Sequence, residues 1–317
     1  MSIPSGRIAA TILIMFNSDT RVLVTGCGGM LGDAVYHTFR KHCAVTATDI
    51  DCNADWLMPL DVRDRVAVEG TVDYVKPDIV LHLAAHTDME FCETHSDEAY
   101  MTNAIGTEHV VFACLKRDLP MVYIGTAGVF DGAQEHYVDY DRPNPLSIYA
   151  KSKFAGEEVV RHHLSRYWIF RAGWMMGGGP AKDKKFIGKI IRQLQAGKRE
   201  LFVVDDKLGS PTFTYDFAGN MLAVLQAEAY GLYHMAGQGE CSRFDVAEEL
   251  LKILGLNEKI ALHKVESTHF ATEYFAPRPD SEKLINLRLK LQGLERMRDW
   301  RESLRDYVSR FPWDIHA

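Results

Sequence analysis

Three glycines that follow a short apolar run constrain this chain more than any other feature. Residues 22–24 (Val-Leu-Val) are typical of a buried parallel strand, and Gly26, Gly29 and Gly32 follow at G-x-x-G-x-x-G spacing. The chain then continues in a helical pattern. Glycines at this spacing allow a tight turn and let backbone amides approach a pyrophosphate at the positive end of the helix dipole. The pattern therefore predicts a dinucleotide-binding turn.

An acidic residue near the end of the second apolar run indicates which dinucleotide is bound. The run AVTATDID places Asp49 seventeen residues beyond Gly32. A carboxylate at this point can accept hydrogen bonds from both hydroxyls of the adenosine ribose, and it repels the 2′-phosphate of NADP. Thr48 or Cys52 could still accommodate a phosphate. We therefore predict binding of NAD or NADP, with NADH slightly favoured.

The order of the remaining segments predicts an α/β fold. Apolar runs alternate with helical stretches from Arg21 onward, as in a Rossmann doubly wound parallel sheet. One helix is expected over residues 95–116. The pattern loosens after Gly173, which favours a smaller mixed α/β substrate-binding lobe. The expected divisions are an N-terminal extension (1–20), a dinucleotide-binding domain (21–173, with 208–236 partly returning to it) and the substrate-binding lobe (174–317).

Composition excludes several classes of function. The 317 residues carry a net charge of −7, which argues against a nucleic-acid partner. The six cysteines show no CxxC spacing, so we expect free thiols in a reducing cytoplasm and no metal site. The apolar stretch 8–16 is too short to cross a membrane. We expect residues 8–16 to form an ordered strand or arm, not an export signal, and we expect no membrane association.

Tyr149 and Lys153 form a candidate acid-base pair. They stand four residues apart in a helical stretch, so both side chains leave the same face. A neighbouring ammonium favours the phenolate and should lower the pKa of Tyr149 from its usual value of about 10. Thr126 ends the run MVYIGT, where its hydroxyl would point into the ligand crevice of a parallel sheet. The three residues are the set expected for hydride transfer at a carbonyl.

Longer motifs extend these signals along the chain. They include PDIVLHLAAHTDMEFCE, NPLSIYAKSKFAGE, VVDDKLGSPT and RPDSEKL. From about Arg21 to Ser309 the sequence resembles the extended short-chain dehydrogenase/reductases, and among them the dTDP-4-dehydrorhamnose reductase family. The resemblance implies NAD(P)H-dependent reduction of a nucleotide-diphospho-4-keto-6-deoxysugar. Hydride would pass to sugar carbon 4 while Tyr149 supplies the proton.

The expected ligand contacts extend beyond the glycines and the catalytic set. Lys153 is also expected to bond the nicotinamide ribose. Arg278 is the preferred diphosphate ligand because it begins the RPDSEKL motif, with Lys184 and Lys185 as further candidates. The other expected cofactor contacts are Met30, Leu31, Asp61, Val62, Leu83, Ala84 and Ala85. The other expected substrate contacts are His86, Thr87, Glu90 and Trp174.

The chain departs from the family pattern beside Thr126. The family usually has Ser-Thr-Asp-Tyr before VFDG, whereas this chain has Gly125-Thr126-Ala127-Gly128. The loss of Asp and Tyr should open space beside the nicotinamide and remove two polar anchors of the sugar. We therefore expect dTDP-4-dehydrorhamnose itself to be a poor substrate, and the missing contacts to come from His86, Thr87 or Glu90.

Two alternative functions stay open at this point. One is an NAD-dependent sugar-nucleotide epimerase, which would retain and recycle its cofactor. The other is a non-catalytic NAD(P)-binding regulatory subunit, although the intact Thr126, Tyr149 and Lys153 argue against it. A 4,6-dehydratase is disfavoured because the Thr-Asp-Glu arrangement of those enzymes is missing. The resemblance also leaves a homodimer open.

Overall fold

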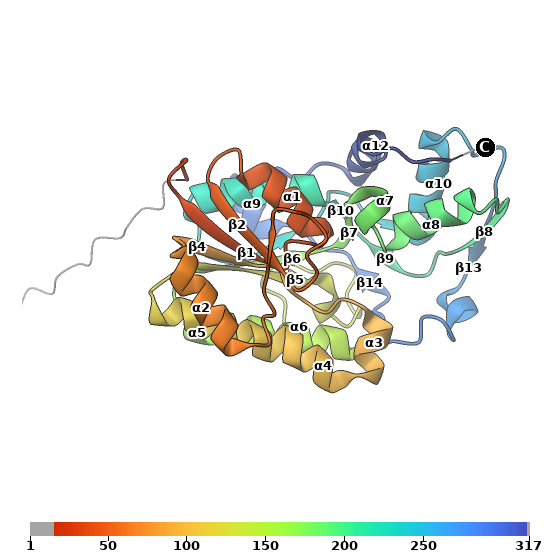
Figure 1. The fold of residues 1–317 in the computed structure, drawn as a ribbon. Coiled ribbons are helices and arrows are strands. Elements are labelled where there is room, and N and C mark those ends of the chain that lie inside the picture. Colours follow the sequence, from red (N-terminus) through yellow and green to blue (C-terminus); the bar gives the residue numbers. More distant parts are fainter. Residues whose placement is uncertain (1–15, 316–317) are drawn as a thin grey trace, which may run out of the picture.

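A seven-stranded parallel sheet forms the centre of the protein (Figure 1). The computed structural model describes residues 16–315. Every ladder of the central sheet is parallel, which confirms the doubly wound α/β fold expected from the sequence. Across the sheet the strands are β11 (Gly231–Met235), β6 (Tyr167–Ala172), β5 (Met121–Thr126), β4 (Ile79–His82), β1 (Arg21–Thr25), β2 (Ala44–Asp49) and β3 (Leu57–Pro59).

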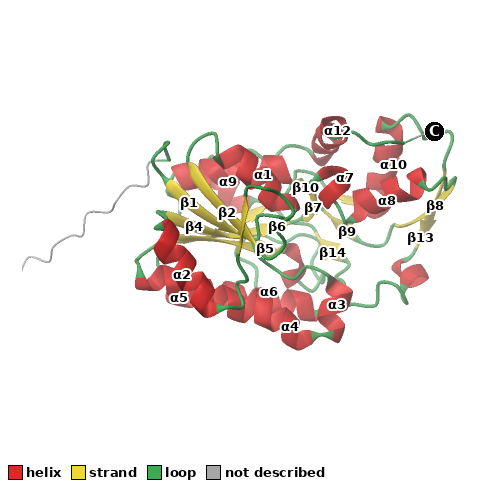
Figure 2. Cartoon of the chain, viewed as in Figure 1, coloured by secondary structure: helices red, strands yellow, loops and turns green. Residues whose placement is uncertain are grey.

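Helices cover both faces of this sheet (Figure 2). All four residues of β4 are buried, as expected for a strand packed on both sides. One face packs against α1 (Met30–Phe39) and α9 (Thr214–Gln226). The other face packs against α2 (Arg65–Val75), α5 (Gly106–Lys116) and α6 (Ile148–His163).

The helix expected over residues 95–116 is interrupted. The chain forms α4 (Ser96–Tyr100), then a π-helical turn η1 (Met101–Ile105), and only then α5. A Cβ atom on Gly156 of α6 would lie 2.3 Å from the backbone oxygen of Asn103, so η1 and α6 are in direct contact. π-turns of this kind occur frequently at functional sites.

The chain leaves the central sheet after Ala172 and builds a second apolar cluster. This cluster is centred on two helices and a pair of parallel strands, α8 (Phe186–Gln195), α10 (Arg243–Ile253), β8 (Glu200–Val204) and β13 (Ala261–Val265). Further elements after β6 are β7 (Trp174–Met176), α7 (Gly179–Lys182), β9 (Leu208–Gly209), β10 (Pro211–Phe213), β12 (Cys241–Ser242), η3 (Ser267–Phe270), β14 (Ser281–Glu282) and α12 (Trp300–Arg310). Helix α11 (Leu287–Leu291) instead packs on the central sheet through Leu289.

Two short elements each follow a strand of the central sheet. The short helix α3 (Met89–Thr94) follows β4, and the 3-10 turn η2 (Ala127–Val129) follows β5. Both lie after the carboxyl end of a central strand, where ligands bind in open α/β sheets.

The expected N-terminal arm falls mostly on residues 1–15, which lie outside the described residues. Phe16 packs edge-on against Phe39, with ring centres 6.3 Å apart. Among residues 16–315, no helix is both long and apolar enough to cross a bilayer. All six cysteines are free thiols.

Candidate active site

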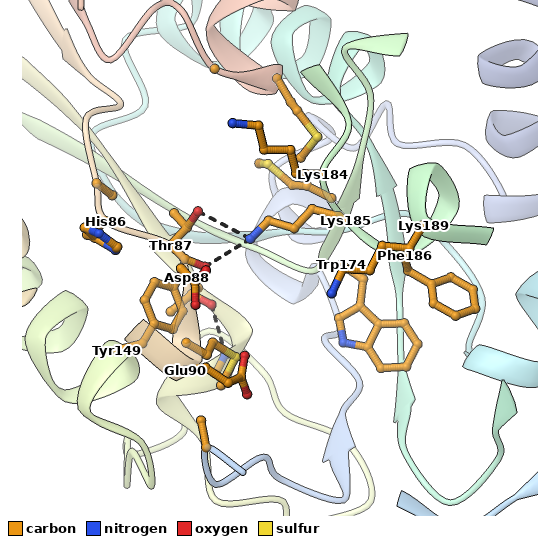
Figure 3. Close-up of a pocket in the computed structure, with 18 of the residues that line it drawn as sticks. His86, Thr87, Asp88, Glu90, Tyr149, Trp174, Lys184, Lys185, Phe186 and Lys189 are labelled. Atoms are coloured by element: carbon orange, nitrogen blue, oxygen red, sulfur yellow. Dashed lines mark hydrogen bonds between the residues drawn. The ribbon is translucent and has the colours of Figure 1, made fainter. Parts of the chain in front are cut away.

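A cavity of about 2270 Å³ follows the carboxyl ends of the central strands and continues to the second apolar cluster (Figure 3). Cavities for one drug-sized ligand usually measure about 300–1,000 Å³. This cavity therefore has room for a dinucleotide and a second ligand together. The glycine turn borders one part, and residues of α8, α10 and β14 border another.

The glycine turn has the geometry of a pyrophosphate cradle. Gly26 has φ +70°, and a Cβ atom there would lie 2.3 Å from the backbone nitrogen of Ala84. A Cβ atom on Gly32 would lie 2.4 Å from Cys27 Cα. Helix α1 begins after Gly29 without a side-chain cap, so its first amides are free to bind an anion. Met30 and Leu31 also line the cavity.

Asp49 lies at the end of β2, beside the glycine turn. Its Oδ2 accepts a hydrogen bond of 2.8 Å from the Gly28 amide, and its Oδ1 accepts one of 2.9 Å from the Asp51 amide. Each carboxylate oxygen has more than one lone pair, so the group can still accept from a ligand. The structure thus fixes the carboxylate at the edge of the cavity, and its role as a ribose ligand stays a prediction.

The other expected cofactor residues also line this part of the cavity, namely Val62, Leu83, Ala84 and Ala85. Asp61 also lines the cavity and lies two residues beyond the end of β3 at Pro59. Its carboxylate is held by Arg63, whose Nη2 lies 2.7 Å from Asp61 Oδ2, and this contact lowers the pKa of Asp61.

Thr126, Tyr149 and Lys153 come together where β5 ends and α6 begins. Burial raises the pKa of Tyr149 to about 12, and a hydrogen bond with the Thr126 side chain opposes this rise. Burial lowers the pKa of Lys153 to about 7, partly offset by Glu157. The structure differs here from the sequence-based expectation. In the protein alone, desolvation of the phenol outweighs any effect of the nearby ammonium.

Asn103 is a further polar residue at this site that the motifs did not single out. Its carboxamide accepts a 2.7 Å hydrogen bond from the His86 amide and donates to the His86 carbonyl at 3.1 Å. It also donates to Ser152 Oγ at 2.9 Å. Asn103 therefore links the segment after β4 to helix α6. In the sequence, the signal for this residue was an asparagine on the apolar face of the helix expected over residues 95–116.

His86 and Thr87 are engaged by neighbouring residues. The His86 ring stacks on Phe91, with ring centres 4.5 Å apart. Lys185 Nζ donates to the Thr87 carbonyl at 3.0 Å and lies 3.3 Å from its hydroxyl oxygen (Figure 3). This lysine thus connects the segment after β4 to α8 across the cavity. Lys184 lines the cavity and makes no hydrogen bond or ion pair within residues 16–315.

Arg278 and Glu90 form an ion pair of 2.7 Å between Nη2 and Oε1. Arg278 Nη1 also donates to the backbone oxygen of Ala276 at 2.9 Å. Much of the hydrogen-bonding capacity of Arg278 is therefore used within the protein. Both residues line the cavity, but the structure gives each a partner that the motifs did not suggest.

Trp174 is surrounded by residues that sequence reasoning missed. Its indole Nε1 donates a 2.6 Å hydrogen bond to Glu282 Oε2. The Arg243 guanidinium lies 3.6 Å from the centre of the indole ring. Gly209 leaves room for the ring, because a Cβ atom there would lie 2.3 Å from Trp174 Cε2. Within the described chain, Arg243 has no hydrogen-bonded or ion-paired partner.

The three small residues around Thr126 differ in their surroundings. A Cβ atom on Gly125 would lie 2.9 Å from Arg171 Cγ, so this glycine is required by packing. Ala127 is 1% exposed and packs in a small apolar cluster. Of the two glycines, only Gly128 could accommodate a Cβ atom at ordinary contact distances. A Cβ atom there would lie 3.5 Å from both Thr126 Oγ1 and Glu282 Oε1.

Comparisons with known proteins agree with the fold and with the family that the sequence resembles. The sequence matches the family described as the RmlD substrate binding domain over residues 20–312. It is 31% identical to dTDP-4-dehydrorhamnose reductase of Mycolicibacterium smegmatis, covering 91% of this chain and 85% of the relative.

Two solved structures have similar folds. One is a dTDP-4-dehydrorhamnose reductase from Clostridium acetobutylicum (TM-score 0.84, 33% identity), and the match covers 92% of this chain and 99% of that one. The other is the dTDP-4-dehydrorhamnose reductase of Bacillus anthracis in complex with NADP (TM-score 0.84, 29% identity), with the same coverage of both chains.

Proposed function

This chain belongs to the RmlD substrate binding domain family, and from that premise we propose that it reduces a nucleotide-diphospho-4-keto-6-deoxysugar with NAD(P)H. It is an oxidoreductase of the extended short-chain dehydrogenase/reductase type. One observation carries the proposed reaction. Thr126, Tyr149 and the buried Lys153 line one cavity together with the glycine turn, and Tyr149 and Lys153 stand one turn apart on α6.

The residues at the glycine turn fit a nicotinamide dinucleotide. The crowded Gly26 and Gly32 and the uncapped start of α1 support a pyrophosphate site. The bound cofactor supplies the hydride that reduces the carbonyl. Asp49 would hold the adenosine ribose and favour NADH. The NADP bound to the Bacillus anthracis relative supports use of NADPH as well.

Tyr149 is the proton donor in this proposal. With a pKa of about 12 its phenol is protonated at neutral pH, which suits an acid that donates to the developing alkoxide. The Thr126 hydroxyl would bind the carbonyl oxygen, and Lys153 would bond the nicotinamide ribose and stabilise the phenolate that remains. Hydride would be added at sugar carbon 4.

The substrate would lie between the sheet and the second cluster. This proposal assigns cofactor binding to residues 21–173 with the returning segment 208–236, and substrate binding to residues 174–317. Trp174 would flank the sugar. For the diphosphate, the cavity offers Lys184 and Arg243, whose N–H groups bond to no residue in the range 16–315, alongside Arg278, whose donors are partly engaged. A free guanidinium is well suited to a phosphate.

A substrate panel tests the reaction. Absorbance of NADH and of NADPH is followed after addition of dTDP-, UDP-, GDP- or CDP-linked 4-keto-6-deoxysugars, beginning with dTDP-4-dehydrorhamnose. Oxidation that depends on one of these sugars, and that disappears with Tyr149→Phe, is the expected result. No oxidation with any member of the panel would contradict the proposal.

A further inference from the structure

Glu282 is held at the edge of the cavity by a short pairing of strands. In β14 it lies opposite Gly209 of β9, which also pairs with Cys241 of β12. Gly209 leaves room for the Trp174 ring, and Trp174 in turn donates to Glu282 Oε2 at 2.6 Å. One carboxylate oxygen is thus fixed by a buried indole, and the orientation of the whole carboxylate follows from it.

The second oxygen of Glu282 faces the space beside the catalytic threonine. Oε1 lies 3.5 Å from the point that a Cβ atom on Gly128 would occupy, and Thr126 Oγ1 lies equally far from that point. The negative charge of Glu282 also acts on Tyr149, since it contributes to raising the pKa of that phenol. Oε1 accepts no hydrogen bond from any residue in the described range 16–315.

Glu282 lines the cavity, so a ligand group can donate to its Oε1 in place of water. Burial raises the pKa of Glu282, while the Trp174 hydrogen bond and the charges of Arg243 and Arg278 oppose this rise. These cations disfavour an ammonium group as the donor, because it would add positive charge among them. A neutral hydroxyl fits the site better.

We propose that Glu282 is a specificity-determining residue that accepts a hydrogen bond from the sugar hydroxyl next to the reacting carbonyl. For a 4-keto sugar this hydroxyl is on carbon 3. The inference rests on the proposed function, and it assigns to Glu282 the sugar contact that the sequence led us to expect from His86, Thr87 or Glu90. Those three residues are engaged by Phe91, Lys185 and Arg278 respectively.

The test compares two substrates in four proteins. The substrates are the preferred 4-keto sugar nucleotide and its 3-deoxy analogue. The proteins are the wild type, Glu282→Ala, Glu282→Gln and the charge-matched control Glu258→Gln. Glu258 is exposed and does not line the cavity.

Glu282→Ala should lower kcat/KM for the hydroxylated substrate by about 10- to 100-fold, mostly through KM. With the 3-deoxy analogue, kcat/KM of Glu282→Ala should equal that of the wild type. With the hydroxylated substrate, Glu282→Gln should lose less kcat/KM than Glu282→Ala does. Glu258→Gln should behave as the wild type throughout.

Equal losses on both substrates would show a merely structural role and overturn the inference. Unchanged kinetics in Glu282→Ala would also overturn it while leaving the reductase function intact. A wild-type protein that is inactive on every 4-keto sugar would overturn the proposed function itself.

Discussion

The ammonium of Lys153 lies 4.1 Å from the centre of the Tyr123 ring, and the Tyr123 hydroxyl donates a 2.8 Å hydrogen bond to the carbonyl of Lys153. The ring face attracts the cation, but it replaces little of the water that the buried ammonium has lost. Lys153 is only 4% exposed, and its pKa falls to about 7. The lysine is therefore close to its titration point at neutral pH.

We expect Lys153 to make the free energy of unfolding depend on pH above neutrality. Its pKa of about 7 in the folded protein is below its usual 10.5, so between these values the unfolded chain binds more protons. Stability from this group should therefore rise with pH over that window, by up to about 1.4 kcal/mol per pH unit.

Urea denaturation of the wild type and Lys153→Met at pH 7, 8 and 9 measures this effect. Other titrating groups are common to both proteins, so their contributions cancel in the difference. The wild type should gain stability relative to Lys153→Met as the pH rises. Parallel pH profiles would show that Lys153 keeps an ordinary pKa.

Tyr149→Phe should nearly abolish turnover while it preserves the binding of the nicotinamide cofactor. The substitution removes the proton donor and keeps the ring, and general acid catalysis contributes about 10²- to 10⁴-fold. Steady-state kinetics with the preferred sugar, together with a fluorescence titration of NADH, checks both parts. Tyr140→Phe is the control, because Tyr140 is 70% exposed and does not line the cavity. Near-wild-type turnover in Tyr149→Phe would remove this residue from the mechanism.

Asp49→Ala should weaken NADH binding more than NADPH binding. The carboxylate would lose its hydrogen bonds to the ribose, worth about 1.5–3 kcal/mol when charged, whereas the 2′-phosphate would gain from its removal. Asp49 also accepts from the Gly28 and Asp51 amides, so some damage to the turn is expected with both cofactors. The ratio of the two dissociation constants, measured by titration, cancels that damage. The control is Asp55→Ala at an exposed site, which should leave the ratio of the dissociation constants unchanged. If Asp49→Ala also left this ratio unchanged, the assignment of Asp49 to the ribose would be wrong.

Local patterns predicted the central sheet and the glycine turn because both depend on residues close together in the chain. Position 26 requires glycine because its φ is +70° and because a side chain there would collide with Ala84. In the sequence, the G-x-x-G-x-x-G spacing indicates this requirement. The strands were readable because a strand buried on both faces is a continuous apolar run.

The residues around Trp174 could not be predicted in the same way. Glu282 reaches the cavity through β14, a strand of two residues that pairs with β9, and no local periodicity marks so short an element. In the sequence, Asn103 could be recognised only as a polar residue on one face of the expected helix. Its hydrogen bonds with His86 depend on tertiary contacts at the π-helical turn η1. The lowered pKa of Lys153 likewise depends on burial by segments distant in sequence.

The glycines on either side of Thr126 should respond oppositely to alanine. At Gly125 the new methyl group would lie 2.9 Å from Arg171 Cγ and 3.3 Å from Glu157 Oε2. These two side chains form a fully buried ion pair of 2.6 Å, which has little freedom to move. Displacing them should cost about 1–3 kcal/mol of stability, as overpacking in a core usually does.

At Gly128 the methyl group would have ordinary contacts of 3.5 Å with Thr126 and Glu282. Gly128→Ala should therefore unfold at the wild-type urea concentration but raise KM for the sugar, whereas Gly125→Ala should unfold at a lower concentration. Equal stability of the two variants would mean that the Arg171–Glu157 pair yields to the extra methyl group.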